Sequence, residues 1–227
     1  MNITNNFSVV HTSQSKGRKI EYIVIHYTAG TTSRPGTATG NADFFRTTTS
    51  EVSSDFIVDD SAVVQYNADI RNRYTWHCGG KLYGTKGGKF YGKCTNANSI
   101  GVEICSTNST GKMQNANDKT YSFTEAAVKN ALELVKHLMK EFNIPADRVI
   151  RHYDVNGKPC PGIIGWNADS GSEAEWEKFK NALGEKTAES EKPKYYVQVG
   201  AFASRENAEN YLAGVKKTYP GAFIKAI

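Results

Sequence analysis

The chain has 227 residues, of which 28 are basic and 23 acidic, so its net charge is +5. This length allows one domain with a sizeable core and a small appendage. The weak positive charge suits an anionic polymer as partner, and equally a mildly basic surface with no special partner. The chain has no apolar run of about 18 residues, which argues against a membrane-spanning helix, so no membrane partner is expected.

The first strong element is the nearly continuous apolar and β-favouring run at residues 20–26. Such a run predicts a strand that is buried on both faces. It closes on His26, which is followed by the turn-prone residues 28–30. Further along, we expect a short helix at 42–46 and a hairpin of two strands at 55–58 and 62–66.

Residues 79–86 and 87–94 form a near-repeat of glycines, lysines and aromatic residues. This segment either contacts an anionic polymer or sugars, or is a flexible insertion. A nucleic-acid partner is not expected, because no recognised nucleic-acid-binding signature accompanies it. Cys78 and Cys94 flank the segment, and their pairing stays open. Cys105, in an apolar stretch, is expected to be a small buried hydrophobic residue.

Residues 100–105 predict the next buried strand, in which Glu103 is the one charged residue. A carboxylate is costly to bury without a partner, so Glu103 is expected to face a polar site or a metal-bound water. The alternative is an edge-strand glutamate that points to solvent.

A capping box at residues 122–125 and apolar residues at helical spacing predict an amphipathic helix that ends before Asn143 and Pro145. His137 is expected on the surface of this helix. A second helix, over residues 174–183, is expected to close the domain.

The segment 151–162 places His152 and Cys160 eight residues apart in a loop with two prolines. A strand end followed by a turn can direct both side chains to one point, as in half of a metal site. The best candidate for a further ligand is His26. Two histidines and one thiolate leave a tetrahedral position open, which is typical of catalytic rather than structural zinc.

Residues 23–28, residues 98–104 and the set of His152, Lys158 and Cys160 together resemble the zinc-dependent N-acetylmuramoyl-L-alanine amidases of the phage-lysozyme and peptidoglycan-recognition type. The resemblance covers roughly residues 18–183. It implies a Zn²⁺ cofactor, peptidoglycan as substrate, and hydrolysis of the amide between N-acetylmuramic acid and L-alanine.

The resemblance implies that Glu103 acts as the general base and that Lys158 stabilises the oxyanion. The alternative for Lys158 is a solvated surface lysine. Trp76 and His77 resemble a segment that lines the substrate groove, where His77 either contacts the stem peptide or simply packs. Some members carry a tyrosine or histidine on the strand that here spans residues 53–56. This chain has neither residue there, so no catalytic role is assigned to that strand. The rival hypotheses are a module that binds peptidoglycan without cutting it, which typically lacks the cysteine ligand, and a zinc-free lysozyme, for which no carboxylate pair is evident.

Residues 184–194 carry charge, Ser, Thr and Pro but no large apolar side chain, which predicts a linker. Residues 195–227 predict a strand, a helix and a strand that resemble the first half of a SPOR domain, which binds glycan strands stripped of their stem peptides. A half-domain leaves strand edges open. It is therefore a remnant, a partly disordered segment, or a unit that pairs with a second chain as a homodimer.

Together these patterns predict an α/β fold with a central mixed β-sheet flanked by helices, and a small C-terminal βαβ unit after a linker. The expected boundaries are 1–183, 184–194 and 195–227. The start of the chain lacks the basic and apolar stretches of a signal peptide. We therefore expect synthesis in the cytoplasm, with release to the cell wall through a holin or lysis, as a phage endolysin or an autolysin.

Overall fold

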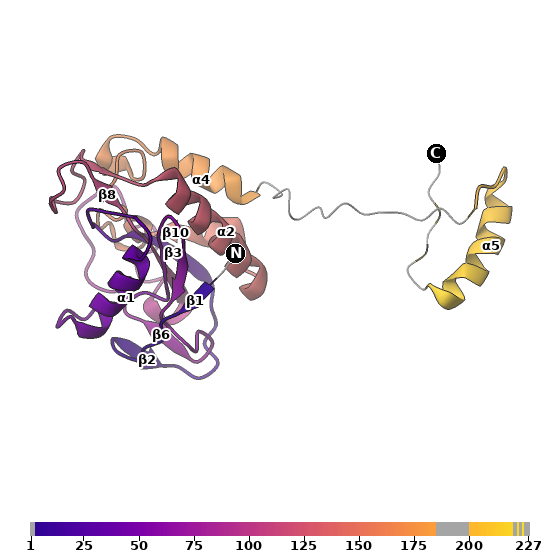
Figure 1. Ribbon diagram of the computed structural model, residues 1–227, viewed down its shortest axis with the longest axis horizontal. Coiled ribbons are helices and arrows are strands. Elements are labelled where there is room, and N and C mark those ends of the chain that lie inside the picture. The colour runs from indigo at the N-terminus through magenta and orange to yellow at the C-terminus, as the bar shows by residue number, and fades with distance from the viewer. Residues whose placement is uncertain (1–2, 185–199, 220–221, 223, 225–227) are drawn as a thin grey trace. The chain divides into compact units, whose positions relative to one another are not determined.

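The computed structural model describes residues 3–184, 200–219, 222 and 224. The chain divides into two units, Met1–Glu185 and Lys186–Ile227 (Figure 1). None of the described helices combines the length and the apolar character that a bilayer crossing requires. Apart from Gly184, the predicted linker lies outside the described residues, and so do most residues of the two strands predicted in the second unit.

The first unit is built on a six-stranded sheet in the order β1-β5-β4-β7-β3-β10. Neighbouring strands are parallel except for β4 and β5, which form the predicted antiparallel hairpin. The sheet strands are β1 (Ile3–Asn5), β3 (Tyr22–Tyr27), β4 (Phe56–Val58), β5 (Val63–Gln65), β7 (Ser99–Ile104) and β10 (Val149–Arg151). Two small antiparallel pairs lie outside it: β2 (Thr12–Gln14) with β6 (Arg73–Thr75), and β8 (Thr107–Asn108) with β9 (Tyr121–Ser122).

Strand β3, which lies between β7 and β10, is buried along its whole length, as the apolar run predicts. Successive side chains of a strand point to opposite faces of the sheet. Ile23 and Ile25 therefore join the main core on one face, whereas Val24 and His26 face the other side. The alternation thus places His26 on the face of the sheet opposite the main core, which we call the polar face.

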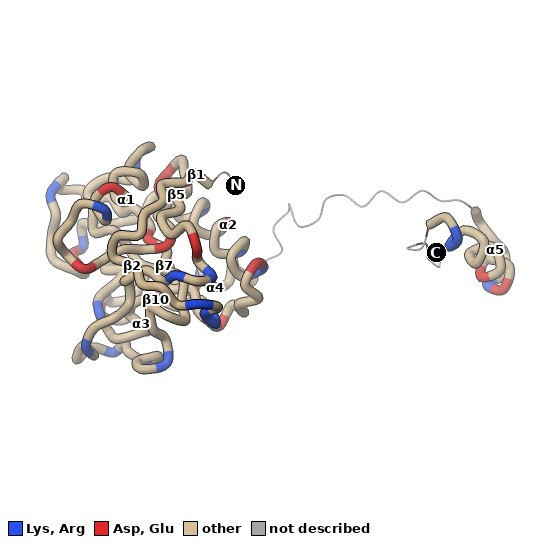
Figure 2. Tube along the Cα trace, turned by 90° about the horizontal axis from the view of Figure 1, so that it is seen from below, with Lys and Arg blue, Asp and Glu red and all other residues tan. Residues whose placement is uncertain are grey.

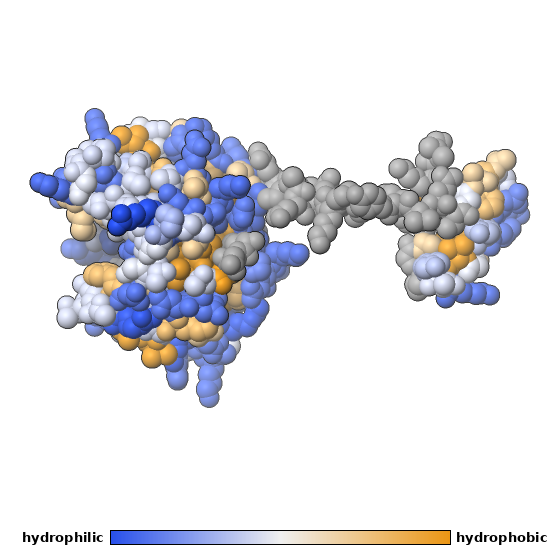
Figure 3. Space-filling view, in the orientation of Figure 1, coloured by the Kyte–Doolittle hydropathy of each residue, from blue (hydrophilic) through white to orange (hydrophobic). Residues whose placement is uncertain are grey.

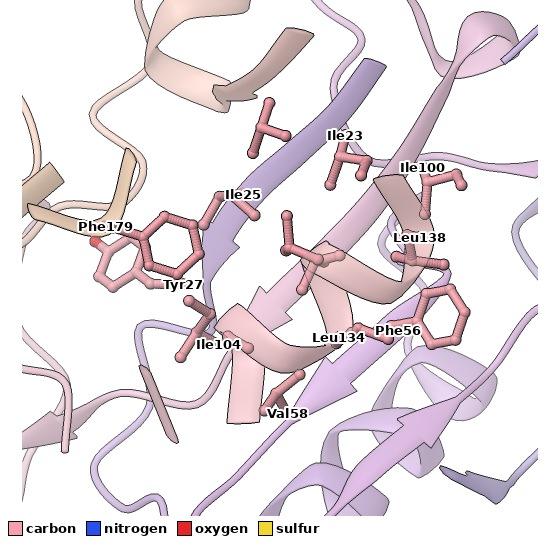
Figure 4. Packing of buried hydrophobic residues seen from close by; sticks show 14 of the residues in the cluster. Ile23, Ile25, Tyr27, Phe56, Val58, Ile100, Ile104, Leu134, Leu138 and Phe179 are labelled. Atoms are coloured by element: carbon pink, nitrogen blue, oxygen red, sulfur yellow. The ribbon is translucent and has the colours of Figure 1, made fainter. Parts of the chain in front are cut away.

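The main core lies under two helices, α2 (Glu125–Phe142) and α4 (Ala174–Gly184) (Figures 1 and 4). Figure 4 shows Leu134 and Leu138 of α2 packed among isoleucines of the sheet. Burying one such side chain stabilises a fold by roughly 1.5–3 kcal/mol. Both helices agree with the predicted ones, and His137 is exposed on α2 as expected.

The start of α2 differs from the prediction. Thr124, rather than Ser122, is the N-cap, and its side chain accepts a hydrogen bond from the N–H of Ala127. Ser122 belongs to β9, where its hydroxyl lies 2.8 Å from the Thr107 hydroxyl. The helix ends as predicted at Asn143, which adopts a left-handed conformation.

The opposite face of the sheet carries α1 (Thr37–Thr47), which is longer than the short helix predicted there. Its first turn is held by the hairpin, because the N–H of Ala38 donates to the Asp59 carboxylate at 2.9 Å. Ala42 and Phe45 then pack on Ile57 of β4. The sequence of this segment does not contain its own cap, so a local pattern could not predict the first turn.

The surface of the first unit shown in Figure 3 is mostly hydrophilic, with small separate hydrophobic patches. In the second unit, helix α5 (Arg205–Thr218) forms where a helix is predicted, and the Ser204 side chain caps it. The rings of Phe202 and Tyr211 lie 5.2 Å apart between centroids, and both side chains remain partly exposed.

Candidate metal centre and catalytic site

Three side chains converge on the polar face of the sheet, namely His26, His152 and Cys160. His26 lies near the end of β3, and His152 begins the short helix α3 (His152–Asn156) directly after β10. Because β3 and β10 are parallel neighbours, both histidines leave the same edge of the sheet. The structure thus brings together all three predicted ligands, each of which is buried.

The geometry of these three residues suits a tetrahedral metal. Their ligand atoms all lie within 4.8 Å of one another, and Cys160 Sγ is 3.6 Å from His26 Nδ1. Zinc bonds of about 2.3 Å to sulfur and 2.0–2.1 Å to nitrogen imply a tetrahedral S···N separation of about 3.5 Å. His152 Nε2 is buried and has no hydrogen-bond partner among the described residues. These residues therefore fit a metal ion.

Burial holds all three ligands in their uncharged forms when no metal is bound. It lowers the pKa of His26 well below its ordinary value, with further lowering by the neighbouring His152. The pKa of His152 is also lowered well below its ordinary value, by burial and then by Lys158. Burial and the nearby Glu103 raise the pKa of the Cys160 thiol to about 12. The imidazoles are thus ready to bind a cation, whereas the thiol must lose a proton to do so.

The loop that carries His152 and Cys160 is fixed by the buried Arg151. Its guanidinium contacts Asp154 and Glu173, each at 2.6 Å, and donates to the Trp166 carbonyl at 2.6 Å. A further backbone hydrogen bond of 2.9 Å runs from the N–H of residue 153 to the Cys160 carbonyl. Both ligands of this loop are therefore held by a common network.

Glu103 lies on β7 on the same face of the sheet as His26. Its Oε2 is buried and has no hydrogen-bond partner within the described part of the chain. Burial raises the pKa of Glu103 to about 8, against the opposing effect of Lys158. The carboxyl group therefore lies on the face that carries His26, and its raised pKa suits proton exchange with a reacting group near neutral pH.

Lys158 stands between the two ligands of the loop and is exposed. Its backbone N–H donates to Asn156 Oδ1 at 3.1 Å, and its carbonyl accepts from the N–H of Cys160 at 2.7 Å. The ammonium group lies close enough to lower the pKa of Glu103 and of His152. It therefore acts electrostatically on the site while remaining accessible to a ligand.

Trp76 and His77 occupy different environments, although they are adjacent. The Trp76 indole N–H donates to Ser13 Oγ at 2.9 Å, and the side chain is only partly buried. His77 is buried, and its Nδ1 lies 3.1 Å from His26 Nε2. No local pattern could predict this contact, because the two histidines are 51 residues apart in the chain.

The Gly- and Lys-rich segment 79–94 is attached to α3 through its backbone. The N–H groups of Tyr83, Gly88 and Phe90 donate to carbonyls of α3 at 2.8, 2.9 and 2.8 Å. Figure 2 shows basic segments close to α3. Residues 70–102 contain six Lys and Arg residues and no Asp or Glu, so the rest of the chain has 22 basic and 23 acidic residues. The positive charge of the protein is thus concentrated in this stretch.

All four cysteines are free in the described residues. Cys78 and Cys94 nevertheless share one buried apolar cluster with Val24 and Ile150. Cys105 is buried, as predicted for a small hydrophobic residue.

The chain matches two protein families. Residues 16–163 match the N-acetylmuramoyl-L-alanine amidase family, and residues 191–227 match the SPOR domain. The chain therefore belongs to the N-acetylmuramoyl-L-alanine amidase family. Both resemblances drawn from the sequence are confirmed.

Particular relatives agree with this assignment. The amidases CwlA and CwlH of Bacillus subtilis are each 36% identical to the chain, over 165 and 149 residues. These matches cover 73% and 65% of this chain, but only 49% and 50% of the relatives, so the chain spans about half their length. The catalytic domain of XlyA superposes with a TM-score of 0.57 at 27% identity, covering 81% of this chain and all of that one. The structure of PlyL gives a TM-score of 0.57 at 26% identity, with 81% and 97% covered.

Proposed function

We propose that the chain hydrolyses the amide bond between N-acetylmuramic acid and L-alanine in peptidoglycan, with zinc held by His26, His152 and Cys160. The observation that carries this proposal is the convergence of the three buried ligands beside a carboxyl group with a raised pKa. A zinc ion bound there would polarise the amide carbonyl and lower the pKa of a water molecule towards about 7.

The protein's own residues supply the proton transfers and the charge stabilisation. Glu103 takes a proton from the attacking water and passes it to the nitrogen of the leaving L-alanine. Its raised pKa suits both steps, because a group with a pKa near the working pH can accept and return a proton. Lys158 stabilises the negative charge that develops on the carbonyl oxygen. The exposed ammonium can reach a substrate without first being uncovered.

The test is a digest of purified cell walls, with assays for new alanine amino termini and for new reducing sugar ends. We expect new amino termini only, their loss on chelation, and their return with zinc. Glu103→Gln should bind zinc like the unaltered chain and release no product. A protein that sediments with the walls but releases neither product would instead be a binding module. An active Glu103→Gln variant would contradict the assigned role of Glu103.

The proposal also covers where the enzyme acts and what its second unit binds. The enzyme acts on the cell wall after holin- or lysis-dependent release, and the SPOR-like unit binds glycan strands. Wall co-sedimentation of the full chain, compared with a chain truncated after residue 184, tests the second point. Pairing of two such units in a homodimer remains a prediction, and sedimentation velocity at several protein concentrations would detect it.

A further inference from the structure

A chain of hydrogen bonds leads from a predicted metal ligand to a backbone carbonyl. His26 Nε2 lies 3.1 Å from His77 Nδ1, and His77 Nε2 lies 3.1 Å from Ser99 Oγ. Ser99 Oγ then donates to the Thr95 carbonyl at 2.5 Å. The side chains of His26, His77 and Ser99 are all buried, so water does not compete freely for these bonds.

The carbonyl fixes the direction of every hydrogen bond in this chain. A carbonyl only accepts, so Ser99 uses its one hydroxyl hydrogen on Thr95 and must accept from His77 Nε2–H. A neutral imidazole with its hydrogen on Nε2 has a bare Nδ1, which accepts from His26 Nε2–H. His26 Nδ1 is then the bare nitrogen, and this is the atom 3.6 Å from Cys160 Sγ.

The metal site gives the same direction independently. His26 Nδ1 is the ring nitrogen that lies 3.6 Å from Cys160 Sγ, so a metal held by both residues would take Nδ1 and leave the hydrogen on Nε2. That hydrogen faces His77 Nδ1 at 3.1 Å, and His77 must then accept it.

The fold holds the His77 ring against β7. The N–H groups of His77 and Cys78 both donate to Asn96 Oδ1, at 3.1 and 2.8 Å. The ring lies over Gly101, where a Cβ atom would come within 2.8 Å of His77 Cγ and 2.7 Å of Ser54 Oγ. Glycine at position 101 therefore leaves the space that the ring occupies.

We propose that His77 is a positioning residue that holds His26 in the Nε2–H tautomer, so that Nδ1 is presented to the metal. This inference rests on the metal site of the proposed function. It gives His77 a role inside the protein, in place of the contact with the stem peptide that its sequence context suggests. Partners of this kind typically contribute 10- to 100-fold to metal affinity.

A matched pair of variants in the 227-residue chain separates the effect of the hydrogen bond from the effect of the ring volume. Asparagine and leucine have the same shape, but only the asparagine Oδ1 can replace His77 Nδ1 as acceptor. We expect zinc affinity, measured by chelator competition, to fall 10- to 100-fold in His77→Leu and to be largely kept in His77→Asn. His137→Leu, at an exposed site on α2, should leave the affinity unchanged. Equal zinc affinity in the unaltered chain and in His77→Leu would overturn the proposal, as would equal losses in both His77 variants.

A second measurement needs no variant. In the zinc-loaded chain labelled with ¹⁵N-histidine, NMR spectra should show His26 bound through Nδ1, with a slowly exchanging proton on Nε2. Zinc on His26 Nε2 would overturn the proposal even if His77→Leu failed to fold. An unaltered chain that binds no zinc would overturn the proposed function as well, whereas an inactive chain with the expected spectrum would contradict the proposed function alone.

Discussion

Glu103 and His26 are direct neighbours across two parallel strands, since residue 26 of β3 is in register with residue 103 of β7. Both side chains point to the polar face of the sheet, where the buried Oε2 of Glu103 has no hydrogen-bond partner in the described part of the chain. The proposed base and a proposed metal ligand are thus positioned by two directly paired strands of the sheet, and not by loops.

Burial of Glu103 should make the stability of the metal-free protein depend on pH. Its pKa is raised to about 8 in the folded state, so between the unfolded value and 8 the unfolded state binds fewer protons and stability falls as pH rises. The free energy of unfolding should be measured by urea denaturation in the presence of a chelator. Between pH 5 and pH 8, the stability of Glu103→Gln relative to the unaltered chain should increase by a few kcal/mol, on the order of 1.4 kcal/mol for each unit of pKa shift. A difference in stability that is the same at both pH values would contradict the raised pKa.

Replacement of Lys158 by methionine should reduce turnover with little loss of fold stability, because the side chain is exposed. Loss of one group that stabilises an oxyanion typically lowers kcat by about 100- to 1000-fold. The measurement is the rate of release of alanine amino termini at saturating substrate. Lys129→Met on the exposed side of α2 provides the control and should retain full activity. A Lys158→Met protein with unchanged kcat would show that Lys158 is a solvated surface lysine.

The N-cap of α2 can be tested by two alanine substitutions. Thr124→Ala removes the hydroxyl that accepts from the Ala127 N–H and should cost about 1 kcal/mol, within a range of 0.5–2. Ser122→Ala removes a hydroxyl pair at the exposed β8–β9 edge and should cost less. Thermal or chemical denaturation of both variants measures the difference. A larger loss for Ser122→Ala would restore the capping box as predicted from the sequence.

The attachment of segment 79–94 to α3 depends on close approach at Gly87. A Cβ atom there would lie 2.3 Å from the Tyr153 carbonyl oxygen and 2.9 Å from Gly157 Cα, so backbone must move to accept it. Gly87→Ala should therefore loosen the segment, and limited proteolysis should cut it faster than in the unaltered chain. Gly84→Ala meets nothing within 4 Å and should be cut at the original rate. Equal cutting of both variants would contradict a tight attachment.

The sequence predicted the elements whose signals are local. The apolar run that ends at His26 and the spacing of His152 and Cys160 each lie within one short segment, and the glutamate inside an apolar strand marked Glu103. The contact of His77 with His26 was not predictable in this way, because it depends on the tertiary packing that places the His77 ring over Gly101 of β7. The first turn of α1 was missed for the same reason, since its capping carboxylate, Asp59, comes from the hairpin.

The segment 79–94 is joined to α3 through main-chain N–H and carbonyl groups, which every residue except proline provides. Its exposed side chains, among them Lys81, Leu82 and Lys89, contribute little to that attachment. Substitutions at these positions can therefore alter the charge and shape presented beside the site without detaching the segment. The outer surface of the segment and its attachment to α3 can therefore be altered separately by substitution.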